Sequence, residues 1–247
     1  MRLLQIDIGN TNIKWRFLVA GELKSRGSIA ISNYGAFKAK ISHLKYIDEV
    51  WIASVASPTF ESKFADILLD LFGKDPWFAA PVQHLAGVTN GYEDFGAIGV
   101  DRWLVILAAW ARFKRELVVV DSGTALTIDM IDKNGLHLGG YIIPGILSME
   151  LALSSNTANV GFKDPFEYGT HPGKDTIHAV RHGVVLAQVG SVQAALSNIG
   201  NSFLRESPVV AFCGGDGQLL HKLSGLDGFW LPDLVFEGLE IAARELL

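Results

Sequence analysis

The chain has 247 residues, of which 49% are hydrophobic and 19% are charged, enough apolar material for a large core in one or two domains. The formal net charge of −5 argues against a nucleic-acid-binding surface. The single cysteine, Cys213, excludes an internal disulfide and a clustered-cysteine metal site, and it suits a reducing cytoplasm. Because we find neither a signal-peptide core nor an apolar run long enough to span a bilayer, we expect a cytoplasmic protein with no membrane contact.

Near the N-terminus, polar groups gather in a tight turn between two predicted strands. Leu3–Ile8 is a short apolar run, and Ile13–Phe17 alternates apolar and basic side chains, so the two segments predict a hairpin. Asp7 ends the first strand, Gly9 allows close approach of a ligand, and Lys14 returns toward the turn. Backbone N–H groups, a hydroxyl and an ammonium suit phosphate oxygens, while the carboxylate suits a hydrated divalent cation. A hairpin turn without any ligand explains this stretch alone equally well.

A second copy of the pattern changes the balance between these two interpretations. The apolar run Leu117–Val120 leads into Asp121-Ser122-Gly123-Thr124, and another strand follows at Ala125–Ile131. The two aspartates, Asp7 and Asp121, are separated by close to half of the chain. This arrangement predicts duplicated domains with an ATP cleft between them. It resembles the superfamily of actin, sugar kinases and heat-shock-protein ATPases, whose phosphate loops have this form.

The remaining elements of the first half follow in the order βββαβαβ, and a helix after Asp101 completes that half. The segments are a third strand near Leu23–Ile29, helical spacing at Tyr34–Leu44, a strand at Val50–Ser54, a helix from Pro58 to Leu71 and a short strand at Trp77-Phe78. This is the ribonuclease-H-like topology that the superfamily duplicates, and the second half repeats it. The predicted fold class is α/β, with two ribonuclease-H-like (actin-like ATPase) domains in tandem at 1–115 and 116–247.

The glycine-rich segment Ala79–Val100 is long for a loop inside a compact domain, which favours a functional role. It ends in Gly99-Val100-Asp101-Arg102, at the start of a predicted helix. Asp101 has two interpretations: an N-cap that accepts a first-turn N–H, or a general base. Arg102 is a candidate clamp for a carboxylate or a phosphate, since a guanidinium binds both in bidentate fashion.

The second half holds three further segments of interest. Gly139-Gly140-Tyr141-Ile142-Ile143-Pro144-Gly145 precedes a helix, and backbone packing is the usual role of such glycines. Asn156–Lys174 is polar and turn-rich, which predicts a surface loop, and a long helix follows at Thr176–Asn198. That helix is apolar nearly all round, so it is buried in its own domain or against a partner. His178 and His182 stand four residues apart on it, and we interpret them as structural or exposed rather than as metal ligands.

Four motifs in this order resemble those of type III pantothenate kinases, and the match extends from Leu3 to about Gly238. The motifs begin at Asp7, Gly99, Asp121 and Gly139. By this resemblance, ATP phosphates would be held by Asp7, Ile8, Gly9, Asn10, Thr11, Asn12, Ile13, Lys14 and Thr124. Asp101 would accept the proton, and Asp121 would bind a monovalent cation. The pantothenate site would be lined by Tyr92, Gly99, Val100, Asp101 and Arg102, with Thr176 reaching it from the partner subunit of a homodimer.

The implied reaction is transfer of the γ-phosphoryl group of ATP to pantothenate, the first committed step toward coenzyme A. Mg²⁺ on the phosphates and K⁺ or NH₄⁺ near Asp121 would offset the phosphate charge, because positioning and charge neutralisation dominate such transfers. Two alternatives remain within this fold. One is a kinase or phosphatase for another small molecule, such as a different carboxylated alcohol. The other is a catalytically inactive relative that acts as a regulatory or transcription accessory protein.

Overall fold

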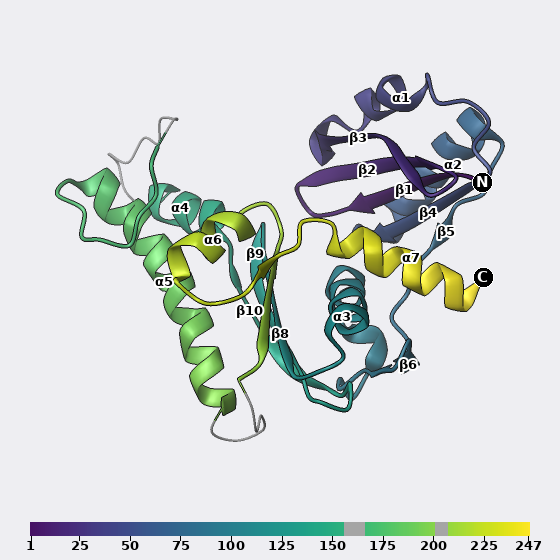
Figure 1. Ribbon diagram of the computed structural model, residues 1–247. Helices are drawn as coiled ribbons and strands as arrows, with labels where there is room; N and C mark the ends of the chain where they lie inside the picture. Colours follow the sequence, from purple (N-terminus) through teal and green to yellow (C-terminus); the bar gives the residue numbers. More distant parts are fainter. Residues whose placement is uncertain (156–165, 201–206) are drawn as a thin grey trace. The chain divides into compact units, whose positions relative to one another are not determined.

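The computed structural model describes residues 1–155, 166–200 and 207–247. The chain divides into two compact units, one formed by Met1–Ala108 together with Leu234–Leu247 and the other by Ala109–Asp233. Each unit has its own five-stranded sheet and its own hydrophobic core (Figure 1). Among the described residues, no helix is both long enough and apolar enough to cross a membrane.

The sheet of the first unit has the strand order β3-β2-β1-β4-β5. Its first three strands form an antiparallel meander, and β4 and β5 run parallel to β1. The strands are β1 (Arg2–Ile8), β2 (Asn12–Val19), β3 (Glu22–Ala30), β4 (Glu49–Ser54) and β5 (Trp77–Phe78). The predicted strands of this half are therefore confirmed in kind and in order.

One face of this sheet is covered by α1 (Gly35–Ile41), which follows the 3₁₀ turn η1 (Ile31–Asn33), and by α2 (Pro58–Phe72). The Ser57 side chain accepts a hydrogen bond from the Phe60 N–H, and Gly73, with φ 64°, ends α2 in the left-handed conformation. The core under these helices contains Leu4, Ile6, Ile8, Ile13, Trp15, Phe37, Ile41, Phe64 and Leu68. Alternation along β1 and β2 thus directs one set of side chains into this core, as the sequence predicts.

Two further helices of the first unit do not contribute side chains to that core. They are α3 (Val100–Phe113), which continues into the second unit after Ala108, and α7 (Leu234–Leu246). α7 contacts β1 and β4, and an added Cβ at Gly238 would lie 2.0 Å from the Leu104 carbonyl oxygen. Only a glycine allows α7 to lie this close to the backbone of α3. The sequence assigns residues after 115 to the second domain, whereas the C-terminal helix belongs to the first compact unit.

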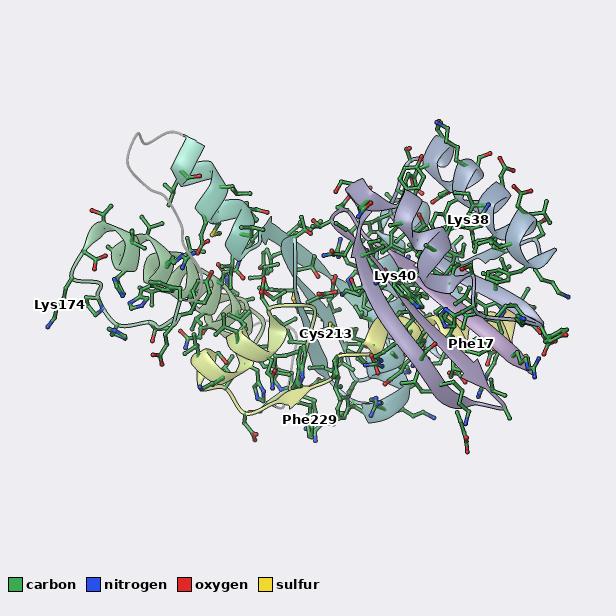
Figure 2. All side chains as sticks on the ribbon, turned by 90° about the horizontal axis from the view of Figure 1, so that it is seen from above. Phe17, Lys38, Lys40, Lys174, Cys213 and Phe229 are labelled. Atoms are coloured by element: carbon green, nitrogen blue, oxygen red, sulfur yellow. The ribbon has the colours of Figure 1, made fainter. Side chains whose placement is uncertain are left out.

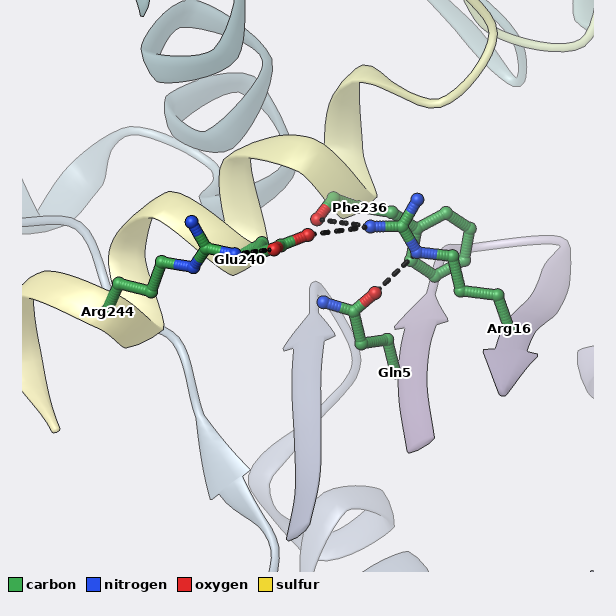
Figure 3. Close-up of polar contacts among 5 residues, drawn as sticks. All are labelled: Gln5, Arg16, Phe236, Glu240 and Arg244. Carbon is green, nitrogen blue, oxygen red and sulfur yellow. Dashed lines mark hydrogen bonds and ion pairs between the residues drawn. The ribbon is translucent and has the colours of Figure 1, made fainter. Parts of the chain in front are cut away.

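A partly buried polar network joins α7 to the sheet (Figure 3). Arg16 on β2 donates to the side chain of Gln5 on β1, and its guanidinium also donates to the Phe236 carbonyl at 3.2 Å. Glu240 accepts from Arg16 at 3.4 Å and from Arg244 one helical turn further along α7. Arg16 therefore ties the sheet to the helix through charge-assisted hydrogen bonds in a site that water hardly reaches.

The second unit repeats the sheet order, as β10-β9-β8-β11-β12. Its strands are β8 (Leu117–Ser122), β9 (Ala125–Ile131), β10 (His137–Pro144), β11 (Val209–Cys213) and β12 (Phe229–Trp230). The repeat extends to single hydrogen bonds: the Val55 N–H donates to the Ile8 carbonyl at 3.0 Å, and the Asp216 N–H donates to the Ser122 carbonyl at 2.9 Å. The predicted duplication of the fold is thereby confirmed.

Three helices complete the second unit: α4 (Ile146–Ser155), α5 (Thr176–Gly200) and α6 (Gly217–Ser224). One side of α5 packs on the sheet through Val184, Val185, Val189 and Val192. Cys213 ends β11, and Lys174 lies in the segment before α5 (Figure 2). Of the predicted surface loop at 156–174, the part at 156–165 lies outside the described residues, and in the rest Phe166 and Tyr168 are half-buried.

Candidate active site

The first turn joins β1 to β2, and the Gly9 N–H closes it by donating to the Asn12 carbonyl at 3.0 Å. Asp7 and Lys14 are direct cross-strand partners, so their side chains project from the same face of the sheet. Ile8 and Ile13 are fully buried in the core, which leaves only their backbone groups for a ligand. The polar tip, Asn10-Thr11-Asn12, is exposed. The turn thus has an exposed polar tip beside a half-buried carboxylate, and its role in phosphate binding stays a prediction.

The second turn joins β8 to β9 in the same manner, with the Gly123 N–H donating to the Ala125 carbonyl at 2.9 Å. Asp121 is half-buried at the end of β8, and Thr124 is exposed at the tip. Two glycines from other segments, Gly145 and Gly214, pack closely against this turn. A Cβ at Gly145 would lie 2.0 Å from the Gly123 carbonyl oxygen, and one at Gly214 would lie 2.2 Å from Asp121 Oδ1. Gly145 and Gly214 thus both allow close packing against this turn, and a side chain on Gly214 would collide with Asp121 and with the Ser122 backbone.

Gln188, on α5, is a fully buried polar residue that bonds both to the second turn and to the segment that packs against this turn. Its amide donates to the Pro144 carbonyl at 2.7 Å, and its Oε1 accepts from the Ser122 hydroxyl at 3.4 Å. Ser122 immediately follows Asp121, and Pro144 immediately precedes Gly145. The sequence gives no signal for this role, because a single glutamine in an apolar helix resembles any other polar position.

Next to Ser122 lies Asp216, the residue that precedes α6. Its backbone N–H donates to the Ser122 carbonyl, and burial raises the pKa of its carboxyl above the ordinary value. The Gly214-Gly215-Asp216 turn therefore brings the backbone of Asp216 to the end of β8, next to Ser122.

In the first unit, Asp101 lies in the first turn of α3, one residue inside the helix start at Val100. Its Oδ1 accepts from the Arg102 N–H at 2.8 Å, and a Cβ at Gly99 would come within 2.6 Å of the same oxygen. The Asp101 carboxylate thus folds back over Gly99, and a side chain at that position would make the carboxylate move. Asp101 is not the residue preceding the helix, so an N-cap does not describe its geometry.

Arg102 is buried, with 5% of its surface exposed, and its guanidinium donates to the Tyr92 hydroxyl at 2.7 Å. The same guanidinium lies 5.4 Å from the centre of the Tyr92 ring. A buried cation beside a phenol is a suitable receptor for the carboxylate of a small molecule. Contacts thus join Tyr92, Gly99, Asp101 and Arg102, the residues that the resemblance assigns to one site, and their role in binding stays a prediction.

Tyr92 belongs to the segment between β5 and α3, which the sequence treats as one long loop. This segment contains the short hairpin β6 (His84–Leu85) and β7 (Val88–Thr89), followed by the 3₁₀ turn η2 (Phe95–Ala97). Asn90 is buried in it and bonds to both Tyr92 and Phe95. Sequence reasoning passed over Asn90; the signal that could have found it is an Asn-Gly pair two residues before a functional tyrosine.

Thr176 is the exposed first residue of α5 in the second unit. The preceding Asp175 caps the helix by accepting from the His178 N–H at 2.9 Å, and this bond lowers the pKa of its carboxyl. Thr176 lines an apolar groove of ≈ 990 Å³ between α4 and α5, whose walls include Met149, Leu153, Gly173, Val180 and Ala187. Three leucines of these helices, Leu147, Leu151 and Leu186, are more than half exposed.

The two polar turns at strand ends suit a phosphate-rich ligand. The buried arginine–tyrosine pair suits the carboxylate of an acceptor, and the carboxylate of Asp101 lies next to this pair in the sequence. A profile of the type III pantothenate kinase family matches residues 3–198 of the chain. The type III pantothenate kinase of Hahella chejuensis is 34% identical over 247 residues, covering 99% of this chain and 98% of the relative. The relative of the same name in Cellvibrio japonicus is 35% identical, covering 97% and 96%.

Two solved structures show the same fold. A Campylobacter jejuni protein described as a Baf family transcriptional activator has a TM-score of 0.62 at 24% identity, covering 98% of this chain and 97% of its own. The activator of 2-hydroxyisocaproyl-CoA dehydratase from Clostridium difficile, solved with bound ADPNP, has a TM-score of 0.56 at 12% identity, covering 99% and 94%. At these identities the likeness concerns the fold alone.

Proposed function

Because the chain belongs to the type III pantothenate kinase family, we infer that it phosphorylates pantothenate with ATP, the first step of coenzyme A biosynthesis. The observation that carries this inference is the contact network of Tyr92, Asp101 and Arg102, which offers a carboxylate receptor and a proton acceptor at the start of one helix. It occurs in a chain whose two turns, at Asp7 and Asp121, repeat one phosphate-binding pattern.

In this proposal the turn from Asp7 to Lys14 and the exposed Thr124 bind the phosphates of ATP. Support comes from the exposed tip at Asn10–Asn12 and from Lys14, which faces the same side of the sheet as Asp7. Phosphoryl transfer has a loose transition state, so positioning these oxygens and balancing their charge account for most of the catalysis.

Arg102 and Tyr92 would hold the pantothenate carboxylate, while Gly99 and Val100 shape the site around it. Asp101 would accept the proton of the attacking hydroxyl as its oxygen bonds to the γ-phosphorus and the bond to ADP breaks. An ionised carboxylate is the reactive form at neutral pH, and such base catalysis contributes roughly 10²–10⁴-fold.

Mg²⁺ and a monovalent cation would supply positive charge that neutralises the phosphates. Asp7 suits the divalent ion, since a carboxylate oxygen is a hard ligand. Asp121 suits K⁺ or NH₄⁺ because its half-buried carboxylate lies near the end of β8, beside the exposed tip of the second turn. We also expect the enzyme to act in the cytoplasm, where reducing conditions suit its one buried cysteine.

We further propose a homodimer whose partner subunit contributes Thr176 to the pantothenate site. Thr176 lines the apolar groove between α4 and α5. Three leucines of the same two helices are exposed as well, Leu147 to 57%, Leu151 to 55% and Leu186 to 53%. Such an apolar surface on paired helices favours contact with another protein surface. A second copy of the chain fits this face, because an isologous contact needs only one apolar patch.

The test of the activity is ADP release with pantothenate as the acceptor. We expect turnover with pantothenate, and a loss of about 10²-fold or more in Asp101→Asn because the amide cannot accept the proton. ATP binding, measured by calorimetry, should be close to wild type in that variant. Turnover only with another carboxylated alcohol would reassign the substrate, and no turnover with any acceptor would favour a regulatory protein.

The cation assignment is tested by exchanging salts at constant ionic strength. We expect high activity in K⁺ or NH₄⁺ and much lower activity in Na⁺ alone, because in this proposal the cation beside Asp121 offsets the charge of the phosphates. Asp121→Asn should remove the difference between the salts. Equal rates of the wild type in sodium and potassium buffers would contradict the role of Asp121.

A further inference from the structure

Asn90 is a buried side chain, 6% exposed, and both its amide oxygen and its amide nitrogen bond within the segment that carries Tyr92. Its Oδ1 accepts from the Tyr92 N–H at 3.1 Å, and its Nδ2 donates to the Phe95 carbonyl at 3.1 Å. Its own backbone N–H donates to the Gln83 carbonyl at 2.9 Å, which anchors it to the residue just before the β6–β7 hairpin. Asn90 therefore closes a local turn with its side chain, while its backbone is bonded to the residue that precedes the hairpin.

The hydrogen bonds continue from Asn90 to Arg102. Asn90 fixes the backbone of Tyr92, and the Tyr92 hydroxyl accepts from Arg102 at 2.7 Å. Arg102 sits in the rigid first turn of α3, whereas Tyr92 sits in a segment with little regular structure. The position of Tyr92 against Arg102 consequently depends on the bonds that hold this segment. Asn90 is a buried polar side chain of the segment and bonds directly to the Tyr92 backbone.

We propose that Asn90 is a positioning residue that sets the Tyr92–Arg102 pair for the carboxylate of the acceptor. This proposal rests on the proposed function of that pair. Asn90 itself is two residues from Tyr92 and acts through the Tyr92 backbone rather than on the substrate. A site held in place before binding loses less conformational freedom when the ligand arrives, so its loss should weaken substrate binding selectively.

The chain provides a matched control in the same segment. Asp94 Oδ1 accepts from the Gly96 N–H at 3.0 Å, which is also a side-chain bond to an amide two residues on. Asp94 is exposed, however, and its bond leads to η2 rather than to Tyr92. Asn90→Ala and Asp94→Ala therefore remove similar local bonds, and only the first removes the support of Tyr92.

The experiment compares steady-state constants for Asn90→Ala, Asn90→Ser, Asp94→Ala and the wild type. In Asn90→Ala we expect the KM for pantothenate to rise about two- to tenfold, with kcat and the KM for ATP within about twofold of wild type. Asn90→Ser, whose hydroxyl still accepts from the N–H two residues on, should recover part of the loss. Asp94→Ala should keep the wild-type KM for pantothenate. Thermal unfolding of each variant confirms that it is folded.

A double-mutant cycle with Tyr92→Phe tests the route of the effect. If Asn90 acts through the Tyr92–Arg102 bond, Asn90→Ala should raise the KM for pantothenate much less in the Tyr92→Phe background than in the wild type. Equal effects in both backgrounds, or equal rises in the two KM values, would overturn the positioning role. Wild-type KM values in Asn90→Ala would overturn it too, while the proposed function stands. Lack of wild-type turnover with pantothenate would refute both proposals together.

Discussion

Glu150 and Arg181 form an ion pair in the interior of the second unit, with side chains 2% and 3% exposed and a separation of 3.4 Å. Tyr168 donates its hydroxyl hydrogen bond to the same carboxylate at 3.0 Å, and Arg181 lies over the Phe166 ring at 4.4 Å. The segment before α5 is thus bound to α4 and α5 by one carboxylate and one guanidinium. Removing either charge would leave the other buried without its counterion, which is strongly destabilising.

Burial and the hydrogen bond to Glu150 raise the pKa of Tyr168 to about 12. We expect a spectrophotometric titration of the folded protein to show one tyrosine that ionises near this pH and is absent in Tyr168→Phe. The folded pKa lies above the unfolded value, so the phenol stabilises the fold below pH ~10, and this contribution disappears as the pH rises toward 12. Because Tyr168 is partly exposed, the contribution is about 1 kcal/mol rather than the full value for two pKa units.

The control for this titration is Glu150→Gln, which keeps a hydrogen-bond acceptor but removes the negative charge. Its Tyr168 should ionise at a lower pH than in the wild type, because two of the causes that raise the pKa come from that carboxylate. If the tyrosine with the highest pKa were still present in Tyr168→Phe, the assignment of the raised pKa to this residue would be wrong.

At the scale of single residues, the sequence indicates candidate functional residues where they belong to a short local motif. Asp7, Asp101 and Asp121 end strands or open a helix beside glycines, and these local signals are visible in one dimension. Gln188 and Ser122 are 66 positions apart and meet only because α5 packs on the sheet. No local pattern marks such a pair, since the bond depends on tertiary packing rather than on backbone preference.

At the scale of elements, strands and helices were predictable wherever alternation or helical spacing was clear. The structure confirms the helix after Pro58, which has a serine cap and a left-handed glycine at its end. The location of α7 was not predictable. Its amphipathic pattern shows that one face is buried, but not on which sheet, and the contacts of Gly238 with Leu104 and of Arg16 with Phe236 decide that question.

The same limit applies to α5, which the sequence shows as apolar nearly all round. The structure divides this surface into two parts. Val184, Val185 and Val189 pack into the core of the second unit, while Leu186 and Ile177 stay exposed. Burial in its own domain therefore explains only part of the apolar composition, and the exposed part is what supports a partner subunit.

At the scale of the whole molecule, the duplication was readable because each half begins with the same strand–Asp–x–Gly pattern. The repeated sheet order and the equivalent hydrogen bonds at Val55 and Asp216 extend the repeat beyond that motif. A dimer is harder to predict, because a single chain shows only one side of an interface between two copies. The exposed leucines of α4 and α5 make dimerisation the most consequential proposal at this scale.

The shared site predicts a specific complementation between two inactive variants. Asp101→Asn removes the proton acceptor, and Thr176→Trp fills the start of the groove at the first residue of α5. We co-express the two chains with different tags and purify the mixed dimer through both tags. If Thr176 acts in the partner's site, one site of the mixed dimer carries both defects and the other carries none. ADP release should then return to about half of the wild-type rate for independent sites. If Thr176 acts within its own subunit, each site keeps one defect and the mixed dimer stays inactive, and a monomer in size-exclusion chromatography would contradict the assembly itself.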